Sequence, residues 1–178
     1  MEEARQQGQV SLPKVILPDV LQRGLRVVFC GTAAGRASEK AQSYYAHGRN
    51  KFWSVLSETG LTDRKLAPHE FREVTRFGIG LTDLCKDVAG SDHEVRPRPE
   101  HRVVLRRKIE ENRPDFLAFT SLEAAKRFVG RRVGLGRYEE SIGTTSIYVL
   151  PSTSPMADWN WMSNKIHWWE FAELVRAS

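Results

Sequence analysis

Two neighbouring stretches in the first third of the chain carry residue types that could hold a flat polar ring. The first, Gly-Thr-Ala-Ala-Gly at 31–35, follows an apolar run that ends at Cys30. A glycine-bounded turn at a strand end presents backbone N–H groups, which bind anions and polar rings. The second stretch brings Tyr45, His47 and Asn50 to the same neighbourhood. An aromatic face with a few polar groups beside a strand end is typical of a site for a flat heterocycle.

The elements that must position these residues alternate between apolar strand-like runs and amphipathic helix-like segments. The pattern predicts buried strands at 25–31, 115–120 and 145–150, and a short strand or tight loop at 77–82. It predicts helices at 50–57, from Pro68, at 99–112, from a Ser121 cap to Gly130, and at 165–176. It leaves loops at 87–99, 131–137 and 151–163.

Buried strands that alternate with helices indicate a mostly parallel sheet with helices on both faces. We therefore predict an α/β fold, a single-domain three-layer α/β/α arrangement around a short central sheet. We expect residues 1–20 to be a flexible N-terminal segment and 21–178 to form the domain. Loops at the carboxyl ends of parallel strands form the binding crevice in such folds, and both stretches described above lie at or soon after a strand end.

Composition narrows the class of protein. The chain has 178 residues, 40% of them hydrophobic, which suits one globular domain with a sizeable core. Its formal net charge is +5 and its pI is about 9.4, near the range of domains that bind a polyanion. Cys30 and Cys85 fit two free thiols in a reducing compartment. The scattered histidines give no metal-ligand spacing, so we expect neither a metal nor a cofactor.

Targeting signals are also lacking in the sequence pattern. No apolar run reaches the length of about 18 residues that a membrane span needs, so we expect no membrane partner. The first residues, Met-Glu-Glu-Ala-Arg-Gln-Gln-Gly, do not have the apolar core of a secretory signal. We therefore expect a cytoplasmic monomer, associated with the nucleoid if the cell is a prokaryote.

Three segments, in the same order, resemble motifs of the uracil-DNA glycosylase superfamily, most nearly its mismatch-specific uracil and hypoxanthine branches. The family's first loop, Gly-x-(Asn/Asp/Glu/Ser)-Pro-Gly, corresponds to Gly31-Thr-Ala-Ala-Gly35. Its aromatic-Ala-His-Pro-x-Asn-Arg-Phe-Trp segment corresponds to Tyr-Ala-His-Gly-Arg-Asn-Lys-Phe-Trp at 45–53. Its Leu-Pro-Ser-Thr-Ser-(Pro/Gly) loop corresponds to Leu-Pro-Ser-Thr-Ser-Pro at 150–155. The resemblance implies a DNA glycosylase domain over 21–178.

The chain departs from the family at the residue expected to activate water. The mismatch-specific branch has an asparagine where Ala33 stands, and a methyl group cannot orient water. Asn50 matches an asparagine that hypoxanthine-type relatives use, so the resemblance makes it a catalytic candidate, and His47 could accept a proton near neutral pH. The alternatives are that Asn50 caps the helix that starts near Lys51 and that His47 is structural.

The resemblance also implies a base-binding pocket. Tyr45 is the candidate to stack on a flipped base, and the backbone N–H groups of the first loop could stabilise charge on a uracil carbonyl. The pocket set is Gly31, Thr32, Ala33, Ala34, Gly35, Tyr45 and Ser121. The alternatives are a packed tyrosine, a plain strand-to-helix turn and a serine that serves only as a helix cap.

DNA contacts are expected from cations and from the loop after the last strand. Hydroxyls on the rigid loop 151–155 could bind phosphates, and an apolar tip beyond it could fill the gap in the base stack. The predicted set is Arg36, Arg49, Lys51, Ser152, Thr153, Ser154, Pro155, Met156 and Trp159, with Arg131, Arg132 and Arg137 near the groove. The alternative is a loop whose Met156 and Trp159 fold back on the protein. The basic run 102–108 is expected to be a solvated helix face.

The function expected from these residues and the resemblance is removal of uracil from DNA by a monofunctional glycosylase. Such an enzyme flips the base, hydrolyses its N-glycosidic bond and leaves an abasic site, as in base excision repair. Hypoxanthine is a further candidate substrate. A second hypothesis is a weak or inactive binder of uracil-containing or abasic DNA, since Ala33 replaces the asparagine. A third, a nucleoside hydrolase, would turn over free deoxyuridine.

Overall fold

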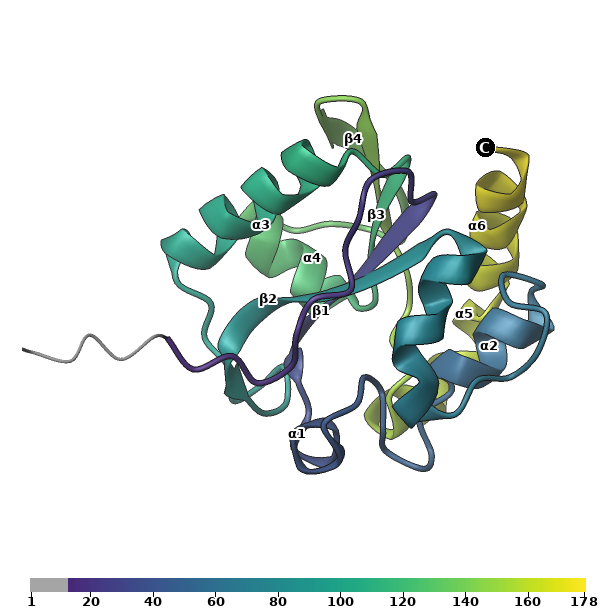
Figure 1. Ribbon diagram of the computed structural model, residues 1–178, viewed down its shortest axis with the longest axis horizontal. Helices are drawn as coiled ribbons and strands as arrows, with labels where there is room; N and C mark the ends of the chain where they lie inside the picture. Colours follow the sequence, from purple (N-terminus) through teal and green to yellow (C-terminus); the bar gives the residue numbers. More distant parts are fainter. Residues whose placement is uncertain (1–12) are drawn as a thin grey trace, which may run out of the picture.

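The chain folds around a central sheet in the computed structural model, which describes residues 13–178 (Figure 1). The sheet has five strands in the order β2-β1-β3-β5-β4. The strands are β1 (Val27–Ala34), β2 (Ile79–Ala89), β3 (Phe116–Phe119), β4 (Gly136–Ile142) and β5 (Thr145–Val149). The helices are α1 (Arg36–Ala41), α2 (Phe52–Glu58), η1 (Pro68–Phe77), α3 (Pro99–Asn112), α4 (Leu122–Val129), η2 (Pro155–Ala157), α5 (Asp158–Asn164) and α6 (Ile166–Ala177).

Four strands are parallel and one edge strand is antiparallel. β1 pairs with β2 and β3, and β3 pairs with β5, all in parallel. β4 pairs with β5 in the antiparallel sense across a turn with Gly143 at φ +57°. The sequence analysis missed β4, because its run Gly-Arg-Tyr-Glu-Glu-Ser-Ile is mostly polar and largely exposed at the sheet edge. An exposed edge strand buries too little apolar surface to show an alternating pattern.

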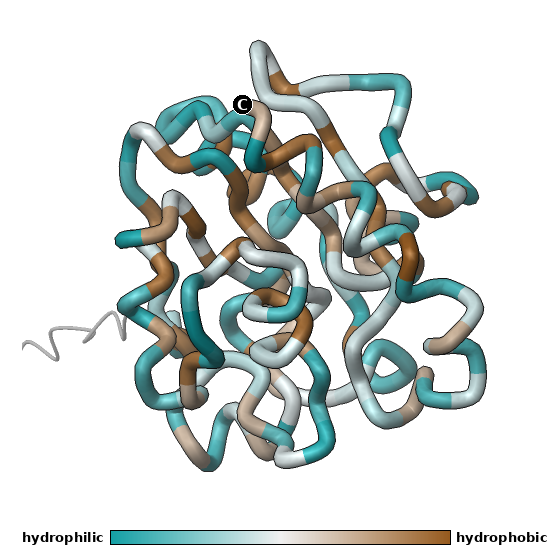
Figure 2. The backbone as a smooth tube through the Cα atoms, turned by 90° about the vertical axis from the view of Figure 1, so that its right-hand side faces the viewer, coloured by the Kyte–Doolittle hydropathy of each residue, from teal (hydrophilic) through white to brown (hydrophobic). Residues whose placement is uncertain are grey.

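Two hydrophobic cores lie on opposite faces of the sheet, which confirms the predicted three-layer α/β/α class. One core joins the sheet to residues of α2, η1 and α6, including Phe52 and Trp168. The other joins it to α3 and α4, including Ile109 and Phe128. Figure 1 shows α3 and α4 on one side of the sheet and α2 and α6 on the other. Figure 2 shows the hydrophilic segments mainly around the outside of the fold.

Helix signals were reliable where caps and an apolar stripe coincide. α3 spans Pro99–Asn112 as predicted, with Leu105 and Ile109 buried. The Ser121 hydroxyl caps α4 by accepting the Ala124 N–H, and Gly130 ends that helix at φ +84°. Both results follow from the preference of serine for N-caps and of glycine for the left-handed C-terminal position.

Two predicted loops were wrong in part. The short strand or loop at 77–82 is the start of β2, which continues to Ala89, so the loop expected at 87–99 begins only after that strand. The segment 151–163 contains η2 and α5 instead of only a loop. No residue of these two short helices is buried, so they have no buried apolar stripe to reveal them.

The described part of the predicted flexible segment 1–20 is attached to the domain, and residues 1–12 lie outside the described residues. The Ile16 N–H donates to the Lys86 carbonyl, and Val20 forms an antiparallel bridge with Leu81. Ile16, Leu17 and Val20 are buried. The sequence pattern did not reveal this attachment because the isolated apolar residues at 13–20 form no regular period, yet Ile16, Leu17 and Val20 join a hydrophobic core.

An ion cluster fastens this segment to the sheet. The Asp19 carboxylate pairs with Lys86 at 2.9 Å and with Lys108 at 2.5 Å, and the Thr82 hydroxyl donates to it at 2.7 Å. Burial alone would raise the pKa of Asp19, but the two lysines outweigh it and hold that pKa below its usual value. Lys108 therefore does not belong to a solvated helix face, in contrast to the sequence expectation.

We predict that Asp19→Asn destabilises the protein by about 2 kcal/mol, because it leaves two half-buried ammonium groups without their shared carboxylate. Urea unfolding at pH 7 measures the change in the free energy of unfolding. Asp63→Asn is the matched control, since Asp63 is exposed. Equal stability of the two variants would show that the cluster contributes nothing.

Candidate active site

A cavity of about 670 Å³ opens at the carboxyl ends of the parallel strands. The three segments singled out in the sequence meet around it. Its lining includes Gly31, Thr32, Ala33, Ala34, Gly35, Arg36, Tyr45, His47, Asn50, Ser121, Ser152, Thr153, Ser154, Pro155, Met156 and Trp159. Parallel strands end at the same edge of a sheet, which is why residues far apart in the sequence converge here.

Tyr45 forms one wall and is anchored on both its ring and its hydroxyl. Its ring stacks on buried Phe52, with centroids 3.8 Å apart and planes 18° apart. Its hydroxyl shares a 3.1 Å hydrogen bond with the Thr120 hydroxyl, and burial raises its pKa well above the usual value. Its backbone has φ +50°, a left-handed conformation that costs energy in a non-glycine residue. The tyrosine is therefore a fixed, neutral platform that borders the cavity.

The first-loop residues are the end of a strand, because β1 continues to Ala34. The Cys30 carbonyl accepts the Thr120 N–H, and β3 ends there. The backbone groups of every second residue in a strand point to the same side. Those of Thr32 therefore point towards the β3 side, where β3 has already ended. The Thr32 hydroxyl is also buried and has no hydrogen-bond partner within residues 13–178. The Thr32 backbone at this edge, in contrast to the buried hydroxyl, therefore offers polar groups that a ligand can satisfy.

Asn50 has the capping role that was the alternative reading. Its Oδ1 accepts the Phe52 N–H at 2.9 Å, near the start of α2, and the Thr153 hydroxyl at 2.8 Å. A carbonyl oxygen has two lone pairs, and both are now used. Asn50 therefore cannot orient water through Oδ1 in this arrangement, whereas its NH2 group forms no hydrogen bond to the described residues.

His47 is exposed at the mouth of the cavity. Its Nδ1 accepts the Arg49 N–H at 3.1 Å, which fixes the side chain in its own turn. In the neutral ring Nε2 then carries the hydrogen and can donate a hydrogen bond to a ligand or to solvent.

The loop after β5 forms the rim of the cavity. The Ser152 hydroxyl accepts the Ser154 N–H, and the Ser154 hydroxyl accepts the Met156 N–H, so both support the turn. Met156 and Trp159 are 65% and 84% exposed, which excludes the alternative in which they fold back. An exposed apolar pair at a cavity mouth is suited to insertion between bases.

The rim cations are paired with acids. Arg49 and Lys51 both contact the Asp158 carboxylate, and Arg36 pairs with Glu94. Arg36 lines the cavity and Arg49 and Lys51 do not, and DNA contacts by the three cations stay a prediction. Arg131 instead bonds Tyr138 and the acids of β4, and it does not line the cavity.

Sequence reasoning missed Asp83, the most unusual group of the cavity. It lies on β2, level with Gly31 of β1, and is 6% exposed. Burial raises its pKa to about 6, although Lys86 opposes the shift. Its side chain forms no hydrogen bond or ion pair with the described residues, because Asp19 takes both nearby lysines. A carboxylate inside the apolar run 79–85 was the available signal.

Known proteins resemble this chain in sequence and in fold. The family model "Uracil DNA glycosylase superfamily" matches residues 18–176. The fold is similar to the solution NMR structure of a Methanosarcina acetivorans protein provisionally described as a uracil DNA glycosylase. The two chains are 18% identical with a TM-score of 0.56, and the match covers 93% of this chain and 97% of that chain. Within residues 13–178, no helix has the length and apolar character to cross a membrane.

We predict that Asp83→Asn stabilises the protein at neutral pH. The pKa of Asp83 rises from 3.8 to about 6 on folding, a shift worth about 3 kcal/mol. At pH values between 3.8 and about 6 the unfolded chain binds fewer protons than the native protein. The free energy of unfolding of the wild type therefore falls as the pH rises through this range. Urea unfolding at pH 4 and pH 7.5 should show the advantage of the variant growing with pH. A constant difference would contradict the buried, unpaired carboxylate.

Proposed function

Because the chain belongs to the uracil DNA glycosylase superfamily, we propose that it is a monofunctional glycosylase that flips uracil from DNA and hydrolyses its N-glycosidic bond. The observation that carries the proposal is the cavity between a fixed tyrosine ring and the open end of β1. It combines a flat aromatic wall with the open backbone edge at Thr32 and with Asp83, a carboxylate only 6% exposed that forms no hydrogen bond or ion pair within residues 13–178. Such a site is suited to a planar ring with carbonyl and N–H groups on its edge.

A base inside a duplex cannot reach this cavity, so the nucleotide must rotate out of the helix. Met156 and Trp159 stand at the rim and are the exposed apolar groups that would occupy the vacated space. Stacking on Tyr45 would stabilise the flipped base by about 1–3 kcal/mol. Insertion of the rim side chains into the helix and stacking of the flipped base on Tyr45 would therefore both offset the energy of unstacking.

Cleavage requires stabilisation of negative charge on the departing base and delivery of water to the sugar. The backbone edge at Thr32 and the free NH2 group of Asn50 are donors that can face a base carbonyl. His47 lies at the mouth, where its Nε2–H can donate a hydrogen bond to the departing base, because its Nδ1 already accepts the Arg49 N–H. Among residues 13–178 no lysine lines the cavity, so none is placed there to form an imine, which favours simple hydrolysis over strand cleavage.

A second function, a binder of uracil-containing or abasic DNA with little turnover, is favoured by one observation. Ala33 replaces the family's asparagine, and the Asn50 carbonyl that could compensate is already occupied by two donors. The two functions share the cavity and differ in whether water is activated.

We predict that purified protein releases uracil from single- and double-stranded oligonucleotides at low salt, and that Tyr45→Ala lowers the rate about 10-fold or more. Asn50→Ala should lower it by about 10². Base release and DNA affinity are measured in parallel. Tyr138→Ala, on β4 and outside the cavity, is the control. Tight binding without any release would favour the binder, and neither binding nor release would refute both functions.

We predict that Met156→Ala lowers uracil release from duplex DNA by about 10-fold but changes release from single strands little, because only a duplex leaves a gap to fill. Met162→Ala is a matched control: Met162 is 73% exposed but does not line the cavity. Single-turnover rates on both substrates give the ratio. Equal effects of the two variants would exclude insertion of Met156.

A further inference from the structure

We propose that Asp83 selects the base by accepting a hydrogen bond from a ring N–H that stands next to a carbonyl. The inference rests on the proposed function and adds the substrate class. Uracil and hypoxanthine carry such a lactam edge, whereas cytosine and adenine present a ring nitrogen lone pair beside an amino group. Asp83 is thus a specificity-determining residue at the floor of the cavity.

Three side chains surround one point above Gly31. A Cβ atom added to this glycine would lie 2.9 Å from Asp83 Oδ1, 3.7 Å from Thr120 Oγ1 and 3.8 Å from the Tyr45 hydroxyl. Any side chain at position 31 would therefore collide with the carboxylate. The glycine lets the carboxylate come close to the β1 backbone and brings one carboxylate and two hydroxyl groups together, all of which border the cavity.

The Asp83 carboxylate can accept a hydrogen bond for which residues 13–178 supply no donor. Asp83 is only 6% exposed, and no hydrogen bond or ion pair satisfies its side chain in the part of the chain that the structure describes. Lys86 and Lys108 both bond Asp19, and the Ser121 hydroxyl bonds Asp92. A buried carboxylate without a partner is costly, and a ligand N–H would remove that cost.

The Asp83 carboxylate provides an acceptor and the neighbouring hydroxyl groups provide a donor for the edge of a base. The carboxylate can accept the N3–H of uracil or the N1–H of hypoxanthine. With the Tyr45 hydroxyl donating to Thr120 Oγ1, the Thr120 O–H can turn towards the adjacent carbonyl. A cytosine or adenine ring nitrogen would instead face the carboxylate with its lone pair, and a site built for a hydrogen bond rejects such a base strongly.

Position argues against the other role open to a carboxylate, the activation of water. Asp83 is level with Gly31, two residues before Ala33 on β1, and beside the buried hydroxyls of Tyr45 and Thr120. The far edge of a flipped base reaches this depth. The sugar, where water must attack, stays nearer the mouth with Met156 and Trp159.

Selection should depend on protonation. A neutral carboxyl group can donate its O–H to N3 of cytosine and accept the cytosine amino group, which erases the distinction. The charged groups that act on Asp83 are Lys86 and Lys108, which favour its ionised form, and Asp19 and Asp92, which oppose it. Its raised pKa, caused first by burial, places this change in the mildly acidic range.

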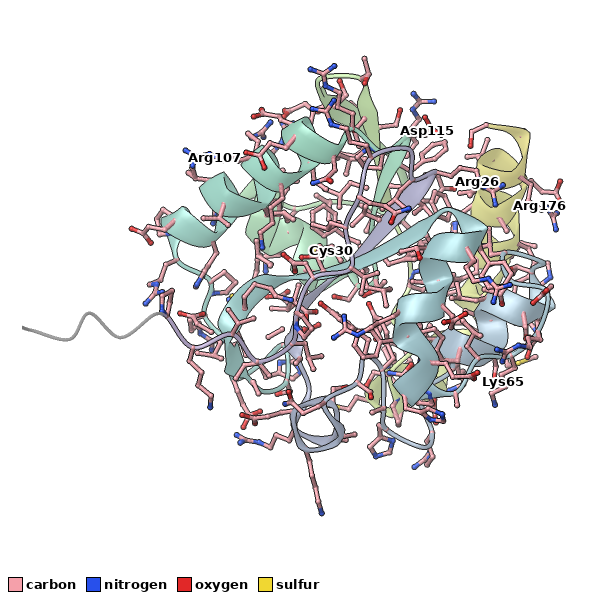
Figure 3. The ribbon with its side chains drawn as sticks, in the orientation of Figure 1. Arg26, Cys30, Lys65, Arg107, Asp115 and Arg176 are labelled. Atoms are coloured by element: carbon pink, nitrogen blue, oxygen red, sulfur yellow. The ribbon has the colours of Figure 1, made fainter. Side chains whose placement is uncertain are left out.

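The test compares uracil with 3-methyluracil, which lacks the N3–H, in otherwise identical oligonucleotides. In the wild type we expect methylation to lower release by about 10² or more. In Asp83→Ala we expect uracil release to fall similarly and the difference between the two bases to vanish, because the partner of the N–H is gone. Asp83→Asn should keep uracil release within about 10-fold of the wild type, since an amide can still accept the N–H. Asp115→Asn, at the opposite end of the sheet (Figure 3), is the control.

A second measurement is the ratio of uracil to cytosine release at pH 5 and pH 8. The ratio should fall at pH 5 in the wild type and be independent of pH in Asp83→Asn. Equal release of uracil and 3-methyluracil by the wild type would overturn the proposal. So would an Asp83→Asn variant as inactive as Asp83→Ala, which would assign the carboxylate to water activation.

If the wild type released no base at all, the proposed function would fail, and affinity would still test Asp83. Fluorescence anisotropy then compares binding of uracil- and 3-methyluracil-containing oligonucleotides. Weaker binding of the methylated strand by the wild type, but not by Asp83→Ala, would support selection by Asp83. Identical affinities in both proteins would overturn it.

Discussion

The candidate site depends on one constraint, the unequal lengths of neighbouring strands. β3 ends at Phe119, whereas β1 runs on to Ala34 and β2 to Ala89. Beyond Cys30 the β1 backbone therefore loses its partner on one side while it stays paired with β2 on the other. The space that β3 leaves is the cavity, and the exposed edge of β1 is its polar wall. A longer β3 would pair this edge and close the site.

A chain of aromatic contacts holds the opposite wall in place. Tyr45 stacks on Phe52, and Phe52 meets Phe29 of β1 and Trp168 of α6 edge to face. The Trp168 indole N–H donates to the Pro151 carbonyl, at the start of the rim loop. The Asn50 side chain links the same loop to α2 through Thr153. The platform, the rim and the hydrophobic core are therefore parts of one packed unit, which limits how far the cavity can widen.

Elements were predicted correctly from the sequence where their signals are local to a few neighbouring residues. The Ser121 cap, the Gly130 stop and the helix at 99–112 were correctly predicted because capping and apolar periodicity are local effects. β4 and α5 were missed because they bury few side chains. Asp83 was missed because its importance arises only from tertiary structure, which brings it to Gly31 and gives its neighbouring lysines to Asp19. The same holds for Asn50, whose oxygen is occupied by a hydroxyl 103 residues away.

The acid-paired cations at the rim bear on how the protein would travel along undamaged DNA. Arg49 and Lys51 share Asp158, and Arg36 holds Glu94, so a phosphate must displace a carboxylate before it gains a full contact. Each such exchange yields less free energy than an unpaired cation would, and it releases fewer counterions overall. The count of 27 lysine and arginine residues therefore overstates how tightly the protein would bind undamaged DNA. Weak and short-lived binding to undamaged DNA would favour a rapid search. Only a nucleotide that enters the cavity would then be bound for long.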